Sequence, residues 1–287
     1  MSDKKLPLFV SLPRSSSTVM FEAGRAYAIR GLGMKDLAEN SEFFRRFSSK
    51  YVSRNKQTNH EAVMELLPVN DRRENMPMKM HYCYPWMFDS HQQSVIHKIR
   101  VLAEERKRGN EYYVKAMAKD FWQAPDELLD FYKDRKIVFL RSRNIHRMAW
   151  SLVFAKCTNI WHVRGHQYDS FQKLTQSDDK VIINKGLVTD VWPDLLVANN
   201  MDNWENKVAH RNIESVTVYH EDLKDFEGVC NVLDQIYETD RWRNFMPEGL
   251  EKTLPLKIEK DYKSWVLNYD EIDSLIRSKI KEDFFKD

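Results

Sequence analysis

Apolar residues gather along the chain into short runs, and the stretches between these runs have the amphipathic spacing of helices. We predict β-strands at residues 8–12, 77–84, 136–142 and 215–220, where apolar and β-branched residues are concentrated. We predict helices at residues 19–30, 35–51, 89–107, 111–122, 126–133, 145–161, 189–210 and 223–237, and irregular structure over the polar residues 163–186. Because helices separate the strands, this order predicts an α/β fold with a parallel β-sheet flanked by α-helices on both faces.

The length and composition of the chain suit a protein with a sizeable core. The chain has 287 residues, 42% of them hydrophobic, and this length suits one large domain or two small ones. No repeat or linker interrupts the alternation of strands and helices, so we predict a single domain over residues 1–287. The 45 basic and 43 acidic residues leave a net charge of +2, which gives no general case for binding nucleic acid or a membrane.

Cysteine usage and the absence of long apolar runs bear on the location of the protein. The first residues lack the apolar segment of a signal peptide, and no apolar run approaches the ~20 residues of a membrane span. Cys83, Cys157 and Cys230 lie far apart and fit neither a zinc spacing nor a disulfide framework. These observations predict a cytoplasmic protein in a reducing environment.

The stretch from residue 8 to residue 28 combines a short apolar run, a small polar loop and a helix-favouring run. Arg14 and the loop Ser15, Ser16, Ser17 and Thr18 lie between the predicted strand and helix. The first backbone N–H groups of a helix have no partner within the helix and attract anions. Hydroxyl groups and a guanidinium group add donors for a phosphate or sulfate. The alternative is an ordinary helix cap with a solvated arginine.

A second candidate anion site follows the apolar run at residues 136–142. Arg143 comes at the end of this predicted strand, and Ser151 follows eight residues later. If the helix begins near Asn144, Arg147 and Ser151 share one helix face. Two guanidinium groups and a hydroxyl group could then bind an anion. In the alternative interpretation, both arginines are surface charges and Ser151 is a tolerated helix residue.

A third candidate site lies in the predicted strand at residues 77–84. Lys79 and His81 fall on one face of this strand because side chains alternate along it. Histidine can accept a proton near neutral pH, and a neighbouring lysine can stabilise negative charge. The alternative is a hydrogen-bonded structural histidine.

Taken in order, these sites resemble the sulfotransferase family that uses 3'-phosphoadenosine 5'-phosphosulfate (PAPS). Residues 13–18, PRSSST, look like the 5'-phosphosulfate loop of the family, and residues 137–151, IVFLRSRNIHRMAWS, look like its 3'-phosphate motif. Residues 79–81, KMH, are similar to the Lys-Thr-His of the cytosolic branch. Residues 218–223, VYHEDL, are similar to the family strand that ends in Tyr-Glu-Asp-Leu.

The resemblance implies a P-loop-like sheet and a reaction in which a sulfuryl group passes from PAPS to a hydroxyl or amine acceptor by in-line displacement. Arg14 would bind the 5'-phosphate and the bridging oxygen, and residues 15–18 would supply hydroxyl and backbone donors. Arg143 and Ser151 would hold the 3'-phosphate, while Arg141 would remain a strand residue.

The same resemblance implies the acid–base groups. His81 would accept the proton of the acceptor hydroxyl, and Lys79 would stabilise the leaving group. The resemblance implies no metal ion. The partners are therefore the nucleotide donor and an unidentified hydroxyl-bearing acceptor.

The chain departs from the family pattern at several positions and looks like a divergent member. Ser16 stands where the family usually has glycine, and Val19 where the cytosolic branch has a tryptophan that stacks on adenine. His220 replaces the motif tyrosine, and Asn144–Ile145 replaces a common Asp-Pro or Asn-Pro. No C-terminal R-K-G-x-x-G motif occurs in the chain.

Two other functions remain open. A kinase or another nucleotide-binding enzyme of P-loop type would use a similar layout, although the consensus G-x-x-x-x-G-K-[ST] is absent. A non-catalytic α/β binding protein with a vestigial anion pocket would also fit. Four aromatic residues could either line an acceptor site or be core residues: Trp150, Phe154, Trp161 and Tyr168. We expect Trp150 and Phe154 to be core residues.

Overall fold

The computed structural model describes residues 5–11, 19–20, 23–24, 78–81, 129–130, 132–161, 166–196, 201–223, 225–238 and 261–284. The predicted loop 13–18 and the predicted helices 35–51, 89–107 and 111–122 lie outside them, as do residues 126–128 of the helix predicted at 126–133.

The described strands form one parallel β-sheet, as the sequence predicts. The strands are β1 (Lys5–Ser11), β2 (Met78–His81), β3 (Arg135–Arg141) and β4 (Ser215–Tyr219). They lie in the order β2-β1-β3-β4, and every neighbouring pair is parallel. Strand β1 therefore pairs with β2 on one side and with β3 on the other.

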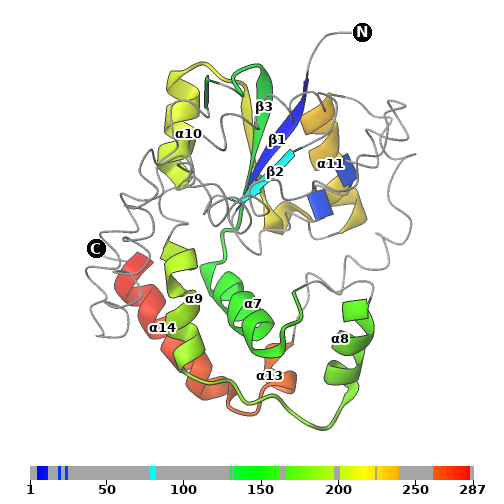
Figure 1. The fold of residues 1–287 in the computed structure, drawn as a ribbon, viewed down its shortest axis with the longest axis vertical. Helices are drawn as coiled ribbons and strands as arrows, with labels where there is room; N and C mark the ends of the chain where they lie inside the picture. The colour runs from blue at the N-terminus through cyan, green and yellow to red at the C-terminus, as the bar shows by residue number, and fades with distance from the viewer. Residues whose placement is uncertain are drawn as a thin grey trace, which may run out of the picture.

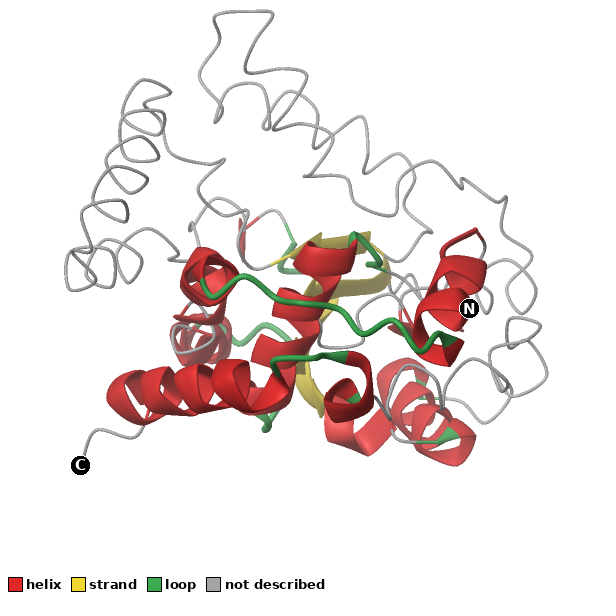
Figure 2. Cartoon of the chain, turned by 90° about the horizontal axis from the view of Figure 1, so that it is seen from below, coloured by secondary structure: helices red, strands yellow, loops and turns green. Residues whose placement is uncertain are grey.

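Helices cover both faces of this sheet, which confirms that part of the fold prediction. The helices are α7 (Ile145–Thr158), α8 (His166–Gln176), α9 (Gly186–Leu196), α10 (Met201–His210), α11 (Phe226–Tyr237), α13 (Tyr262–Trp265) and α14 (Tyr269–Phe284), with a 3-10 helix, η5 (His220–Leu223). In Figure 1 the strands run between α10 on one side and α11 on the other. Seen from below, helices lie on both sides of the strands (Figure 2).

Alternation along β3 explains the two layers. Ile137 and Phe139 pack into a core cluster with residues of α7, α9, α10 and α14, whereas Val138 and Leu140 pack into a second cluster with α11. All four side chains are fully buried. Four consecutive buried apolar residues in a strand are typical of a parallel sheet that is covered on both sides.

Helix α7 is the central helix of the larger cluster. Eight consecutive residues, 148–155, are buried. This part of the helix is therefore covered on all sides, unlike a surface helix, which buries one face only. The Trp150 ring stacks with both Tyr262 and Tyr269, whose ring centroids are 5.4 Å and 4.6 Å away. Phe154 is also buried, so the expectation that Trp150 and Phe154 are core residues is confirmed.

One secondary-structure prediction is wrong. Residues 163–186 were expected to be irregular, but α8 spans His166–Gln176. Tyr168, Phe171 and Leu174 recur at three-residue intervals and pack against the larger cluster, so a short amphipathic face holds an otherwise polar helix. The predicted helix 189–210 is helical wherever it is described, in α9 and α10, while residues 197–200 lie outside the described part.

No helix in the described ranges is both long enough and apolar enough to cross a membrane.

Candidate functional site

The carboxyl ends of the four described strands meet at one edge of the sheet. Ser11, the last residue of β1, is in register with His81 of β2 on one side and with Leu140 of β3 on the other. Arg141, the last residue of β3, is in register with Tyr219 of β4. In open α/β sheets, ligands bind outside this edge. The three predicted sites therefore lie at or next to the edge of the sheet where ligand binding is expected.

The first predicted site is framed by described elements. Arg14, Ser15, Ser16, Ser17 and Thr18 lie outside the described residues. Before them, β1 ends at Ser11, and after them residues 19–20 and 23–24 are helical. Val19, Met20 and Ala23 are buried in the cluster that contains Phe9 of β1. The predicted strand before residues 13–18 and the predicted helix after them are thus confirmed where they are described, while residues 13–18 themselves stay a prediction.

The third predicted site lies on β2. Lys79 is in register with Phe9 of β1, and His81 with Ser11. Backbone alternation puts Lys79 and His81 on the same face of the sheet, as the sequence predicts. For β2 the structure describes the backbone alone, so the contacts of these two side chains lie outside the described part of the molecule.

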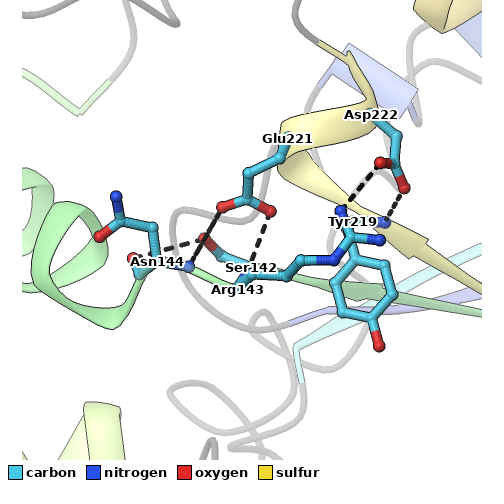
Figure 3. A network of polar contacts seen from close by, with 6 residues as sticks. All are labelled: Ser142, Arg143, Asn144, Tyr219, Glu221 and Asp222. Atoms are coloured by element: carbon cyan, nitrogen blue, oxygen red, sulfur yellow. Dashed lines mark hydrogen bonds and ion pairs between the residues drawn. The ribbon is translucent and has the colours of Figure 1, made fainter.

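The loop between β3 and α7 is built around a carboxylate from another part of the chain. Glu221, in η5, accepts hydrogen bonds from the Ser142 hydroxyl at 2.6 Å, the Arg143 backbone N–H at 3.0 Å and the Asn144 backbone N–H at 3.2 Å. Figure 3 shows its carboxyl group pointing into this loop. The loop before α7 thus already binds an anion, and that anion belongs to the protein.

Burial of Glu221 alone would raise the pKa of its carboxyl group. The hydrogen bonds from Ser142 and from the backbone N–H groups, including those of Arg143 and Asn144, act in the opposite direction and prevail, so the pKa lies below its ordinary value. Glu221 is therefore ionised at neutral pH and acts as a fixed negative charge under the loop.

Arg143, the predicted 3'-phosphate ligand, is held by two contacts, one with Tyr219 at the end of β4 and one with Asp222 in η5. Its Nη1 donates to Asp222 Oδ1 at 2.9 Å, and its guanidinium carbon lies 3.7 Å from the centroid of the Tyr219 ring. Asp222 Oδ2 also accepts a hydrogen bond from the Tyr219 backbone N–H at 3.3 Å. The Arg143 side chain is 54% exposed, so it remains accessible to a ligand at the edge of the sheet.

Arg147 and Ser151 lie in α7 as predicted, but they differ in their environments. Arg147 Nη2 donates to the Ser142 hydroxyl at 3.1 Å, and its backbone N–H donates to the cap residue Asn144 at 2.8 Å. Ser151 is 4% exposed and belongs to the buried run of α7. Of the two predicted 3'-phosphate ligands, Arg143 is at the surface and Ser151 is buried.

Arg141 is the last residue of β3, in agreement with its prediction as a strand residue. Its Nη1 donates to Asp202 at 2.5 Å and to Glu205 at 3.1 Å, both on α10. Glu205 also accepts a hydrogen bond from Thr217 of β4 at 3.0 Å. Arg141 therefore joins the sheet to α10, and Arg143 is the arginine exposed at the edge.

Ser142, Glu221 and Asp222 are residues of the site whose roles the sequence alone did not predict. Glu221 and Asp222 belong to the stretch 218–223 that carries part of the family resemblance, and this was the available signal. The structure shows what these acids contact, because it brings the ends of β3 and β4 together (Figure 3).

No model of a known protein family matches the chain, and no curated protein matches its sequence significantly.

Proposed function

We propose that the protein is a PAPS-dependent sulfotransferase with a P-loop-like sheet. One observation carries the proposal: β1 pairs in parallel with both β2 and β3, and the carboxyl end of β1 is in register with both. The three predicted sites therefore lie at or directly after neighbouring strands. They are residues 14–18 after β1, the pair Lys79 and His81 in β2, and Arg143 after β3. A donor with two phosphate groups and an acceptor would meet at this edge.

The exposed guanidinium group of Arg143 fits the 3'-phosphate of such a donor. Among the described residues, Asp222 is the one side chain that accepts a hydrogen bond from it, and a guanidinium group has five N–H donors. A phosphate can therefore bind Arg143 while Asp222 stays in place. Ser151 is buried, so Arg143 carries the larger part of this contact.

In the proposed reaction, Arg14 and the hydroxyl and N–H groups of residues 15–18 bind the 5'-phosphosulfate end. His81 accepts the proton of the acceptor hydroxyl as its oxygen attacks sulfur. The bond between sulfur and the bridging oxygen breaks, and Arg14 and Lys79 stabilise the negative charge that develops on the leaving phosphate. Positioning and electrostatic stabilisation account for most of the catalysis, by analogy with phosphoryl transfer.

Cytoplasmic location remains part of this proposal. Within the described part of the chain, Cys157 and Cys230 form no disulfide bond, which is in keeping with a reducing compartment.

A thermal-shift comparison of two nucleotides tests the proposal without knowledge of the acceptor. The desulfated co-product, 3'-phosphoadenosine 5'-phosphate, carries the 3'-phosphate that ADP lacks. At about 100 times its dissociation constant a ligand stabilises a protein by ~2.7 kcal/mol, and each kcal/mol raises Tm by roughly 2–4 °C in a domain near this size. We expect the bisphosphate to raise Tm by several degrees without magnesium, and ADP to raise it much less.

Arg143→Ala should remove most of the difference between the two nucleotides, because it removes the charge that binds the 3'-phosphate. Arg211→Ala is the matched control, since Arg211 precedes β4 and pairs with Asp130 away from the carboxyl edge. Equal shifts from ADP and the bisphosphate in the unmodified protein would refute the proposal. Dependence on ATP and magnesium would favour a P-loop-type kinase, and unchanged PAPS with many acceptors would favour a non-catalytic binding protein.

A further inference from the structure

The guanidinium group of Arg143 lies against an aromatic ring instead of extending freely into solvent. Its central carbon is 3.7 Å from the Tyr219 ring centroid, which is the distance of direct contact. Arginine favours such stacking because its guanidinium group is planar and weakly hydrated. Figure 3 shows the Arg143 side chain passing beside the Tyr219 ring, with Asp222 at its end.

The two contacts restrict different motions of Arg143. The Tyr219 ring limits the tilt of the guanidinium plane, and the 2.9 Å hydrogen bond to Asp222 limits its rotation within that plane. Asp222 is itself held by the Tyr219 backbone N–H at 3.3 Å. A free arginine side chain would lose much rotamer entropy on binding a phosphate, and a side chain that is already held loses less.

We propose that Tyr219 is a positioning residue for Arg143 and thereby sets the preference of the protein for a 3'-phosphorylated nucleotide. The inference rests on the proposed function for the identity of the ligand. The position of Tyr219 also distinguishes it from His220, which replaces the motif tyrosine: His220 is buried, whereas Tyr219 presents its ring to the exposed arginine.

Two substitutions separate the ring from the rest of the tyrosine. Tyr219→Phe keeps the ring and removes the hydroxyl group, whereas Tyr219→Leu keeps an apolar side chain and removes the ring. Both retain the backbone N–H that donates to Asp222.

The first measurement needs no ligand. The Arg143 Nε proton is assigned by its loss in Arg143→Lys, and it should show an upfield ring-current shift in the NMR spectrum. The shift should persist in Tyr219→Phe and vanish in Tyr219→Leu.

The second measurement is the ratio of the dissociation constants for ADP and 3'-phosphoadenosine 5'-phosphate. We expect Tyr219→Leu to lower this ratio by roughly two- to fivefold, in line with an exposed cation–π contact, and Tyr219→Phe to retain it. The dissociation constant for ADP should change little in either variant, because ADP lacks the 3'-phosphate. A general disturbance of the edge would instead weaken both ligands.

The outcomes separate this inference from the proposed function. Tyr219→Leu could remove the ring-current shift and yet leave the ratio of the two dissociation constants unchanged. That result would overturn the positioning role and leave the sulfotransferase proposal intact. Absence of the shift in the unmodified protein would also overturn the positioning role alone. Absence of any preference for the bisphosphate in the unmodified protein would overturn both.

Discussion

The Glu221 carboxylate accepts a 2.6 Å hydrogen bond from the Ser142 hydroxyl, although 79 positions separate the two residues in the chain. This contact joins the segment after β4 to the loop after β3. Because Arg143 follows Ser142 and Asp222 follows Glu221, the same junction places the exposed arginine against its acidic partner. The geometry of the second predicted site is therefore decided by a carboxylate that is not itself a predicted ligand.

Glu221→Gln should destabilise the protein. The substitution removes an ionised acceptor of three hydrogen bonds and puts an amide N–H₂ group near backbone donors. Hydrogen bonds to charged groups contribute roughly 1.5–3 kcal/mol, so we expect the free energy of unfolding in urea to fall by about 1–3 kcal/mol. Glu271→Gln is the control: Glu271 is exposed and pairs with Lys185 on the surface, so its substitution should change the free energy of unfolding much less than Glu221→Gln does. Equal effects of the two variants would contradict the role of Glu221.

Asp273 on α14 should contribute stability that depends on pH. Burial works to raise the pKa of Asp273, but hydrogen bonds from Arg277, Trp150 and His146 lower it to about 2. Since this folded-state pKa lies below the ordinary 3.8, the stabilisation is complete above about pH 4 and is lost as the pH falls toward about 2.

Asp273→Asn should therefore lower the free energy of unfolding by roughly 1–3 kcal/mol near pH 6 and by less near pH 3. Urea unfolding of both proteins at the two pH values measures this difference. A difference that stays constant or grows toward low pH would exclude a lowered pKa at Asp273.

Gly228→Ala should disturb the segment that carries Glu221 and Asp222. A Cβ atom on Gly228 would lie closer to the backbone carbonyl oxygen of Asp222 than Cβ atoms come to other atoms in proteins. The backbone of η5 would have to move, at a cost of about 1–3 kcal/mol. Gly186→Ala is the matched control, because the nearest atom there is a side-chain oxygen at 3.2 Å. Urea unfolding should show a large loss for Gly228→Ala, and an unaffected protein would contradict the close packing of η5 on α11.

Arg14→Ala tests the first anion site. We expect the variant to fold, to bind the bisphosphate more weakly and to lose sulfuryl transfer by a factor of ~10²–10³, which is typical for removal of one preorganised charge donor. Sulfuryl transfer from PAPS is measured as the rate at which the bisphosphate is released. The melting temperature without ligand is the control for folding. Near-normal activity would exclude the proposed role of Arg14.

His81→Ala tests the proposed base. A base touches the acceptor and not the nucleotide, so kcat should fall while the dissociation constant of the bisphosphate stays nearly unchanged. If both quantities change together, His81 is a structural residue or part of the nucleotide site.

Much of the secondary structure follows from local sequence pattern. The apolar run IVFL predicts β3, and the strand at Arg135–Arg141 agrees with the prediction to within one residue. The run SVTVY of β4 and the start of α7 after the cap residue Asn144 are also local features. Periodicity and capping act over a few residues, so the sequence alone reveals them. The parallel sheet with helices on both faces follows from the alternation of these elements.

The contacts at the candidate site depend on tertiary structure. Arg143 and Ser151 were found from their spacing, but nothing in that spacing shows that Arg143 lies on Tyr219 or that Ser151 is buried. These facts depend on strand order and register, which put Arg141 beside Tyr219 and so bring the segments after β3 and β4 together. Several strand orders are compatible with the same apolar pattern, because burial of apolar area does not depend on which neighbour covers it. Directional hydrogen bonds between distant residues, such as Ser142 with Glu221, exist only once one order has formed.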